Sequence, residues 1–113
     1  MNILIGNDNN LNSKLIEEIK ILTPIERMTL TDLEQKNIEQ VPDGYLFINL
    51  LDTIIQSSVI LRQLKEKFPK HTIIAMHCFQ VDHMIESLIQ EGFDAYISVL
   101  NFEEGIHDVI TSA

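Results

Sequence analysis

Residues 45–52 read Tyr-Leu-Phe-Ile-Asn-Leu-Leu-Asp, and this stretch decides the fold that we expect for the 113-residue chain. Its apolar run, residues 45–48, follows the turn signal Pro42-Asp43-Gly44. Such a run is typical of a strand buried on both faces, as central strands of parallel sheets are. Asn49 follows at the carboxyl end, where ligands and chemistry collect in open parallel sheets. The sequence therefore places an amide, which is a poor nucleophile, where a reactive group would be expected.

On both sides of this stretch, short apolar segments alternate with amphipathic ones. Strands are expected at residues 3–5, 25–30, 45–48, 72–76 and 95–98, and helices at about 11–22, 32–40, 57–68, 81–90 and 102–110. This alternation predicts a parallel sheet with right-handed crossovers. Five units in 113 residues fit the flavodoxin-like strand order 2-1-3-4-5, whereas a barrel needs roughly 250 residues. We therefore expect one α/β domain, a three-layer sandwich with its site between the first and third strands.

Individual residues are expected to cap the ends of the helices or to face the core. The candidate capping residues are Asn9 or Asn10 for the first helix, Thr31 or Asp32 for the second, and Asn101 with Glu104 for the last. For the fourth helix, apolar spacing predicts inward positions at Val81, Met84, Ile85, Leu88 and Ile89, with Gly92 just past its end.

Charge and composition limit the function classes. The net charge is −9, from 17 acidic and 8 basic residues, and a surface of that sign repels phosphate backbones, so we expect no nucleic-acid binding by this domain. The single cysteine, Cys78, excludes an internal disulfide. No run of 18 apolar residues occurs, and no basic segment precedes the first strand. These features predict a cytoplasmic protein with neither a membrane span nor a signal peptide.

The whole chain resembles the receiver domain of bacterial two-component response regulators. The stretches that carry the resemblance are Ile3–Asp8, Pro42–Asn49, His71–Cys78 and Gln90–Leu100. In that family an acidic pair after the first strand and a phospho-accepting aspartate after the third hold Mg²⁺. A threonine or serine after the fourth strand and a lysine after the fifth then hold the phosphoryl oxygens. The resemblance implies a role in two-component or phosphorelay signalling, with an output such as transcription.

Most of the positions that match this motif carry other residue types. They are Asn7, Asp8, Asn49, His77 and Val99, and only Asp8 fits the motif. Asn49 cannot form an acyl phosphate, and Val99 removes the positive charge. Because Asn7 is also neutral, Asp8 is the remaining Mg²⁺ ligand and binding should be weak at best. We therefore expect a degenerate receiver, or pseudo-receiver, that needs no cofactor.

Other interpretations stay open. Asp52, in the loop after the central strand, is an alternative phosphoacceptor, although its simplest interpretation is a carboxylate that faces solvent. Cysteine and histidine are Zn²⁺ ligands, but the spacing of His77, Cys78, Asp82 and His83 matches no standard pattern. His77 is also a candidate pH-sensitive donor in the pocket. A further alternative is a flavodoxin-like domain that binds a small ligand. The loop after the first strand argues against it, because this loop lacks the Ser/Thr/Gly-rich cradle that a phosphate group would need.

Contacts with other proteins are the expected mode of action. The resemblance places Tyr96 where the family has an aromatic residue that swings between buried and exposed states; the alternative is a tyrosine at the edge of the core. It also implies that the face formed by the fourth helix, fifth strand and fifth helix contacts an output domain or a second copy. The last helix ends close to Ala113, which suggests the N-terminal domain of a longer regulator. The sequence shows neither paired carboxylates nor a Ser–His–Asp set, so no such set indicates an enzyme.

Overall fold

The computed structural model describes residues 2–36, 43–53, 56–78 and 80–111. The strands are β1 (Ile3–Ile5), β2 (Glu26–Met28), β3 (Tyr45–Asn49), β4 (Thr72–His77) and β5 (Ala95–Ser98). The α-helices are α1 (Asn10–Lys20), α2 (Leu30–Glu34), α3 (Ser57–Lys67), α4 (Asp82–Glu91) and α5 (Phe102–Thr111). Two 3₁₀ turns, η2 (Leu50–Asp52) and η3 (Val99–Asn101), directly follow β3 and β5. In these residues, no helix is long and apolar enough to cross a membrane.

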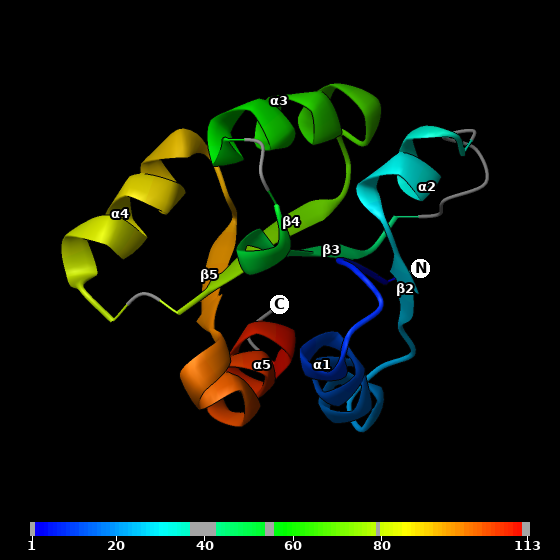
Figure 1. Cartoon of the computed structure of the whole chain (residues 1–113). Helices are drawn as coiled ribbons and strands as arrows, with labels where there is room; N and C mark the ends of the chain where they lie inside the picture. Colours follow the sequence, from blue (N-terminus) through cyan, green and yellow to red (C-terminus); the bar gives the residue numbers. More distant parts are fainter. Residues whose placement is uncertain (1, 37–42, 54–55, 79, 112–113) are drawn as a thin grey trace.

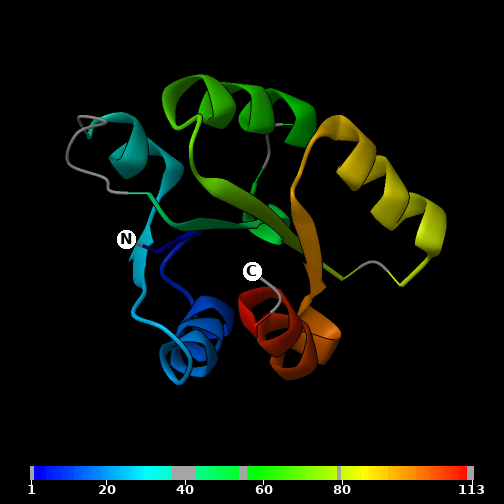
Figure 2. The ribbon, with the colours of Figure 1, turned by 180° about the vertical axis from the view of Figure 1, so that it is seen from behind.

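The strands form one parallel sheet in the order β2-β1-β3-β4-β5, which confirms the flavodoxin-like fold. Helices α1 and α5 cover one face of the sheet, and α2, α3 and α4 cover the other (Figures 1 and 2). The strand order reverses between β1 and β3, so the carboxyl ends of these two strands bound the switch point. The residues at this crevice are therefore the first candidates for a functional site.

Strand β3 runs through the middle of the core, as its sequence predicts. Leu46, Phe47 and Ile48 are fully buried. Leu46 and Ile48 pack in the cluster that includes Leu64 of α3, whereas Phe47 packs in the cluster that includes Leu15 of α1. Since successive side chains of a strand point to opposite faces, both faces of β3 are covered by helices.

The first two helices begin at asparagine and threonine caps. Asn9 caps α1 by accepting a hydrogen bond from the backbone N–H of Asn12. This confirms Asn9, one of the two caps predicted for the first helix. Helix α2 begins earlier than predicted, because Thr29 is its N-cap and Asp32 completes a capping box with it. The predicted caps Thr31 and Asp32 are therefore wrong. The predicted end of this helix, residues 37–40, lies outside the described residues.

Helix α4 is less buried than its apolar spacing predicts. Leu88 is buried, but the predicted inward residues Val81, Met84 and Ile89 are 49%, 37% and 43% exposed. The helix packs beside β5, the edge strand, so the sheet covers only part of its apolar surface (Figure 1). Gly92 ends the helix with a φ of 122°, as a C-terminal glycine is expected to do.

The start of α5 also differs from the prediction. Asn101 belongs to the 3₁₀ turn η3, which continues directly into the helix, so it does not occupy an extended N-cap position. The hydroxyl of Ser98 accepts a hydrogen bond from the backbone N–H of Leu100 and caps η3 instead.

Candidate functional site

Asn49 ends β3, and both ends of its side-chain amide are hydrogen-bonded. The side chain is fully buried. Its Nδ2 donates to Oδ1 of Asn12 at 2.7 Å, and its Oδ1 accepts from the backbone N–H of Leu51 at 3.0 Å. The second bond stabilises η2, the turn that follows the strand. The amide therefore faces the start of α1, at the switch point, with no hydrogen-bonding atom left unpaired.

Asn12 extends this contact into a network, and the sequence interpretation missed it. It is a fully buried polar residue on α1. Its Nδ2 donates to the backbone carbonyl of Asn7 at 2.7 Å and to Oδ2 of Asp52 at 2.6 Å. A signal was present in the sequence: Asn12 lies three and seven residues before Leu15 and Ile19, so it shares their helix face.

Asp52 is drawn into the same network, so the interpretation of a solvent-facing carboxylate is wrong. The residue is half-buried in η2. Its Oδ2 accepts from Asn12 and from the backbone N–H of Asn7 at 3.1 Å, and its Oδ1 accepts from Nδ2 of Asn9 at 3.3 Å. The 3₁₀ turn bends the chain back over the loop after β1, which the sequence alone did not indicate. We call the five residues Asn7, Asn9, Asn12, Asn49 and Asp52 the asparagine network.

Gly6 shows how closely the network fills the crevice. A Cβ atom at this buried position would lie 2.5 Å from Nδ2 of Asn12 and 2.9 Å from Oδ2 of Asp52. The carbonyl of Gly6 also accepts a hydrogen bond of 3.2 Å from Arg27 on β2. The space beyond the end of β1 is thus taken up by groups of the protein itself.

The residues at the switch point do not fit a magnesium site. Mg²⁺ requires oxygen ligands in near-octahedral geometry. Asn7 and Asp8 are exposed, Asn7 is uncharged, and three N–H donors occupy three of the roughly four lone-pair sites of the Asp52 carboxylate. Within the described part of the chain, no three His, Cys, Asp or Glu side chains are grouped to hold a metal ion, so nothing favours a zinc site at His77 either.

The end of β4 forms a second polar contact near the crevice. His77 is half-buried, its Nδ1 accepts a hydrogen bond of 2.8 Å from the backbone N–H of Cys78, and burial lowers its pKa. The hydroxyl of Tyr96 on β5 donates to the backbone carbonyl of His77 at 3.0 Å. Tyr96 is half-buried and packs against the core, so in this structure it ties β5 to β4.

Val99 contributes no polar group to the site. It begins η3, is half-buried, and packs against the core cluster that includes Leu4 and Phe102. The structure thus brings Asn7, Asn49 and Asp52 into one network and leaves Asp8 exposed beside it.

Comparison with known proteins gives a match at the level of structure. No protein-family model matches the sequence, and no curated protein matches it. A DNA-binding response regulator of the LuxR family from Staphylococcus aureus superimposes with a TM-score of 0.70 and 17% identity, over 97% of this chain and 96% of that one.

Two further solved structures agree. RcsB from Salmonella enterica serovar Typhimurium, bound to a promoter in the presence of phosphomimetic BeF₃⁻, gives a TM-score of 0.73 at 12% identity, over 99% of this chain and 67% of that one. A response regulator in red light signaling of R. palustris gives a TM-score of 0.66 at 12% identity, over 96% of this chain and 90% of that one. The fold is therefore the receiver fold of response regulators.

Proposed function

We propose that this chain is a receiver-like signalling domain that is not phosphorylated at the end of β3 and acts through contacts with other proteins. The receiver fold of its structural neighbours supports a signalling role. The observation that carries the proposal is the buried hydrogen bond between Asn49 Nδ2 and Asn12 Oδ1, because it fixes an amide where an acceptor carboxylate would have to stand.

The network also argues against Asp52 as a substitute acceptor. A carboxylate oxygen must approach phosphorus in line with the leaving group. Both oxygens of Asp52 accept hydrogen bonds from N–H donors, two of them on Oδ2, which stabilise the negative charge and make the carboxylate a weaker nucleophile than a free one. Val99 supplies no charge to neutralise the phosphoryl oxygens, and Asp8 by itself would hold Mg²⁺ only weakly.

Without a covalent switch, regulation has to come from a partner that binds one conformation better than another. Two of the neighbours are a DNA-binding regulator and a promoter-bound one. We extend the proposal to an output in transcription, carried by another domain or protein, since the acidic surface disfavours DNA contact by this one. A contact through the face of α4, β5 and α5 that includes Tyr96 stays a prediction.

Phosphoryl transfer from acetyl phosphate tests the proposal. The chain is incubated with acetyl phosphate and Mg²⁺ beside an active receiver, and intact mass is measured. We expect no adduct of one phosphoryl group on this chain and a clear adduct on the active receiver. An adduct that is lost in Asp52→Ala but kept in Asp82→Ala, a change of an exposed carboxylate on α4, would overturn the proposal in favour of the Asp52 acceptor.

A further inference from the structure

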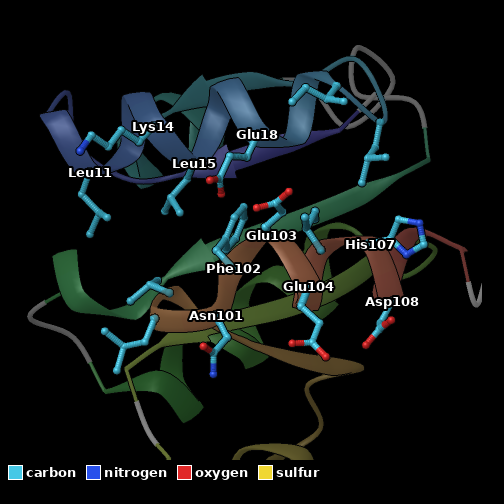
Figure 3. Close-up of a pocket in the computed structure, with 15 residues that line it drawn as sticks. Leu11, Lys14, Leu15, Glu18, Asn101, Phe102, Glu103, Glu104, His107 and Asp108 are labelled. Atoms are coloured by element: carbon cyan, nitrogen blue, oxygen red, sulfur yellow. The ribbon is translucent and has the colours of Figure 1, made fainter.

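A groove between α1 and α5 lies outside the asparagine network. It has a volume of about 990 Å³ and is lined by side chains of α1, of the turn that follows α1, of η3 and of α5 (Figure 3). Four apolar residues that line it are exposed to solvent: Leu11, Ile21, Leu22 and Leu100. Ile21 and Leu100 are 83% and 60% exposed, which is unusual for large aliphatic side chains that line one groove.

Acidic side chains surround this apolar strip. The carboxylates that line the groove are Glu18, Glu103, Glu104 and Asp108, and Lys14 is the one amine among its lining residues. Glu18 on α1 and Glu103 on α5 extend toward one another across the groove (Figure 3). Among the described residues, neither of these two carboxylates has an ion-pair partner. The groove therefore combines unpaired negative charge with uncovered apolar surface.

We propose that this groove binds a basic amphipathic helix of a partner protein. The lengths of α1 and α5, 11 and 10 residues, correspond to about 15 Å each, or roughly three turns that a third helix could lie along. An amphipathic helix would place an apolar stripe on Leu22 and Leu100, and lysine or arginine at its edges would meet Glu18 and Glu103. This surface rests on the proposed function, since it names where a controlling partner would dock.

Charge and burial disfavour the main alternatives. A symmetric contact with a second copy would set the same four carboxylates against each other, because both partners of a two-fold interface use the same patch. An anionic membrane surface would be repelled for the same reason. This chain's own basic helix, α3, cannot be the occupant, since it buries its apolar residues Ile60, Leu61 and Leu64 in the core.

Titration with a designed peptide tests this proposal. The probe is a synthetic helix of leucine and lysine with leucines at helical spacing, added to the whole ¹⁵N-labelled chain, and the readouts are amide shifts and a Kd. We expect shifts confined to α1, η3 and α5. The double variant Glu18→Lys/Glu103→Lys should weaken binding about tenfold or more, equivalent to about 1.4 kcal/mol. Leu100→Ser, which changes no charge, should also weaken it.

The matched control is Glu17→Lys/Glu86→Lys, which changes the net charge equally at two exposed positions that do not line the groove. Equal weakening in this control, equal binding of a peptide with the same composition in scrambled order, or shifts centred on α4 would overturn the proposal. A wild-type dimer in sedimentation that Leu100→Ser dissociates would assign the groove to a second copy and also overturn it. Because peptide binding does not depend on phosphorylation, a phosphoryl adduct with normal peptide binding would reject the proposed function alone.

Discussion

Nδ2 of Asn12 lies 2.6 Å from Oδ2 of Asp52, a hydrogen bond between residues 40 positions apart in the sequence. It joins α1 to the turn after β3, across the crevice where related folds hold their ligands. Oδ1 of the same amide accepts from Asn49, so one side chain bridges the strand end and the carboxylate. Asn12 therefore makes the crevice a part of the protein's own packing.

Removal of the Asn12 side chain should destabilise the fold. Asn12→Ala leaves the buried Nδ2 of Asn49 without an acceptor and takes one donor from Asp52. We expect the free energy of unfolding to fall by about 1–3 kcal/mol, the usual loss when a buried polar group is left unpaired. Urea unfolding followed by circular dichroism measures it. Asn10→Ala, at an exposed position of the same helix, is the control and should change stability far less.

A methyl group at Gly6 should conflict with the network. Gly6→Ala would place Cβ 2.5 Å from Nδ2 of Asn12, so we expect a loss of about 1–3 kcal/mol from overpacking. The loss should be smaller in an Asn12→Ala background, where the conflicting amide is absent. A double-mutant cycle measures this coupling energy. Strict additivity of the two changes would show that the amide does not limit the space at Gly6.

Restoring a carboxylate at the end of β3 should not restore a working receiver. In Asn49→Asp the new carboxyl would be buried and would face Oδ1 of Asn12. If the Asn12 amide flipped so that its Nδ2 donated to the new carboxylate, its Oδ1 would face two other acceptors, the Asn7 carbonyl and the Asp52 carboxylate. We expect a loss of about 3 kcal/mol or more at neutral pH, as for other unpaired buried charges, and no phosphoryl adduct by mass.

The pH dependence of this variant follows from the burial of the new carboxyl. Burial raises the folded-state pKa above the unfolded value, so the folded state binds more protons in between, and stability falls as the pH rises through that window. The destabilisation should therefore be small at acid pH and full at pH 7. Asn101→Asp, at an exposed position, is the control. A phosphoryl adduct on Asn49→Asp would contradict the expectation.

His77 should titrate below its ordinary pKa of 6.5, since burial lowers it. Its Nδ1 accepts from the backbone N–H of Cys78, and protonation would abolish that bond. The unfolded chain binds the proton more readily, so this stability contribution is present above pH 6.5 and is lost as the pH falls toward the folded pKa. The pH dependence of the ring-proton NMR shift of His77 measures the pKa. A pKa for His77 at or above 6.5 would contradict this prediction.

The sequence predicted the architecture well because the architecture depends on local periodicity. The buried run of β3, the alternation of strands and helices, and Gly92 at the end of α4 are all short-range patterns that tertiary contacts reinforce. The errors occur where contacts with other elements of the fold determine how much of a side chain is buried. The apolar spacing of α4 gave no sign that an edge strand would leave Val81 and Met84 exposed.

The candidate site was likewise predicted from the sequence only in part. The sequence by itself determined that an amide, Asn49, stands at the end of the central strand, because the identity and register of that residue follow from the run before it. Only the tertiary structure decided what the amide contacts. Asn12 and Asp52 lie 37 positions before and three after it, and hydrogen bonds join them only because parallel pairing of β1 with β3 sets α1 beside η2. Periodicity is a local property of the chain, whereas a network across a crevice depends on which ends the fold brings together.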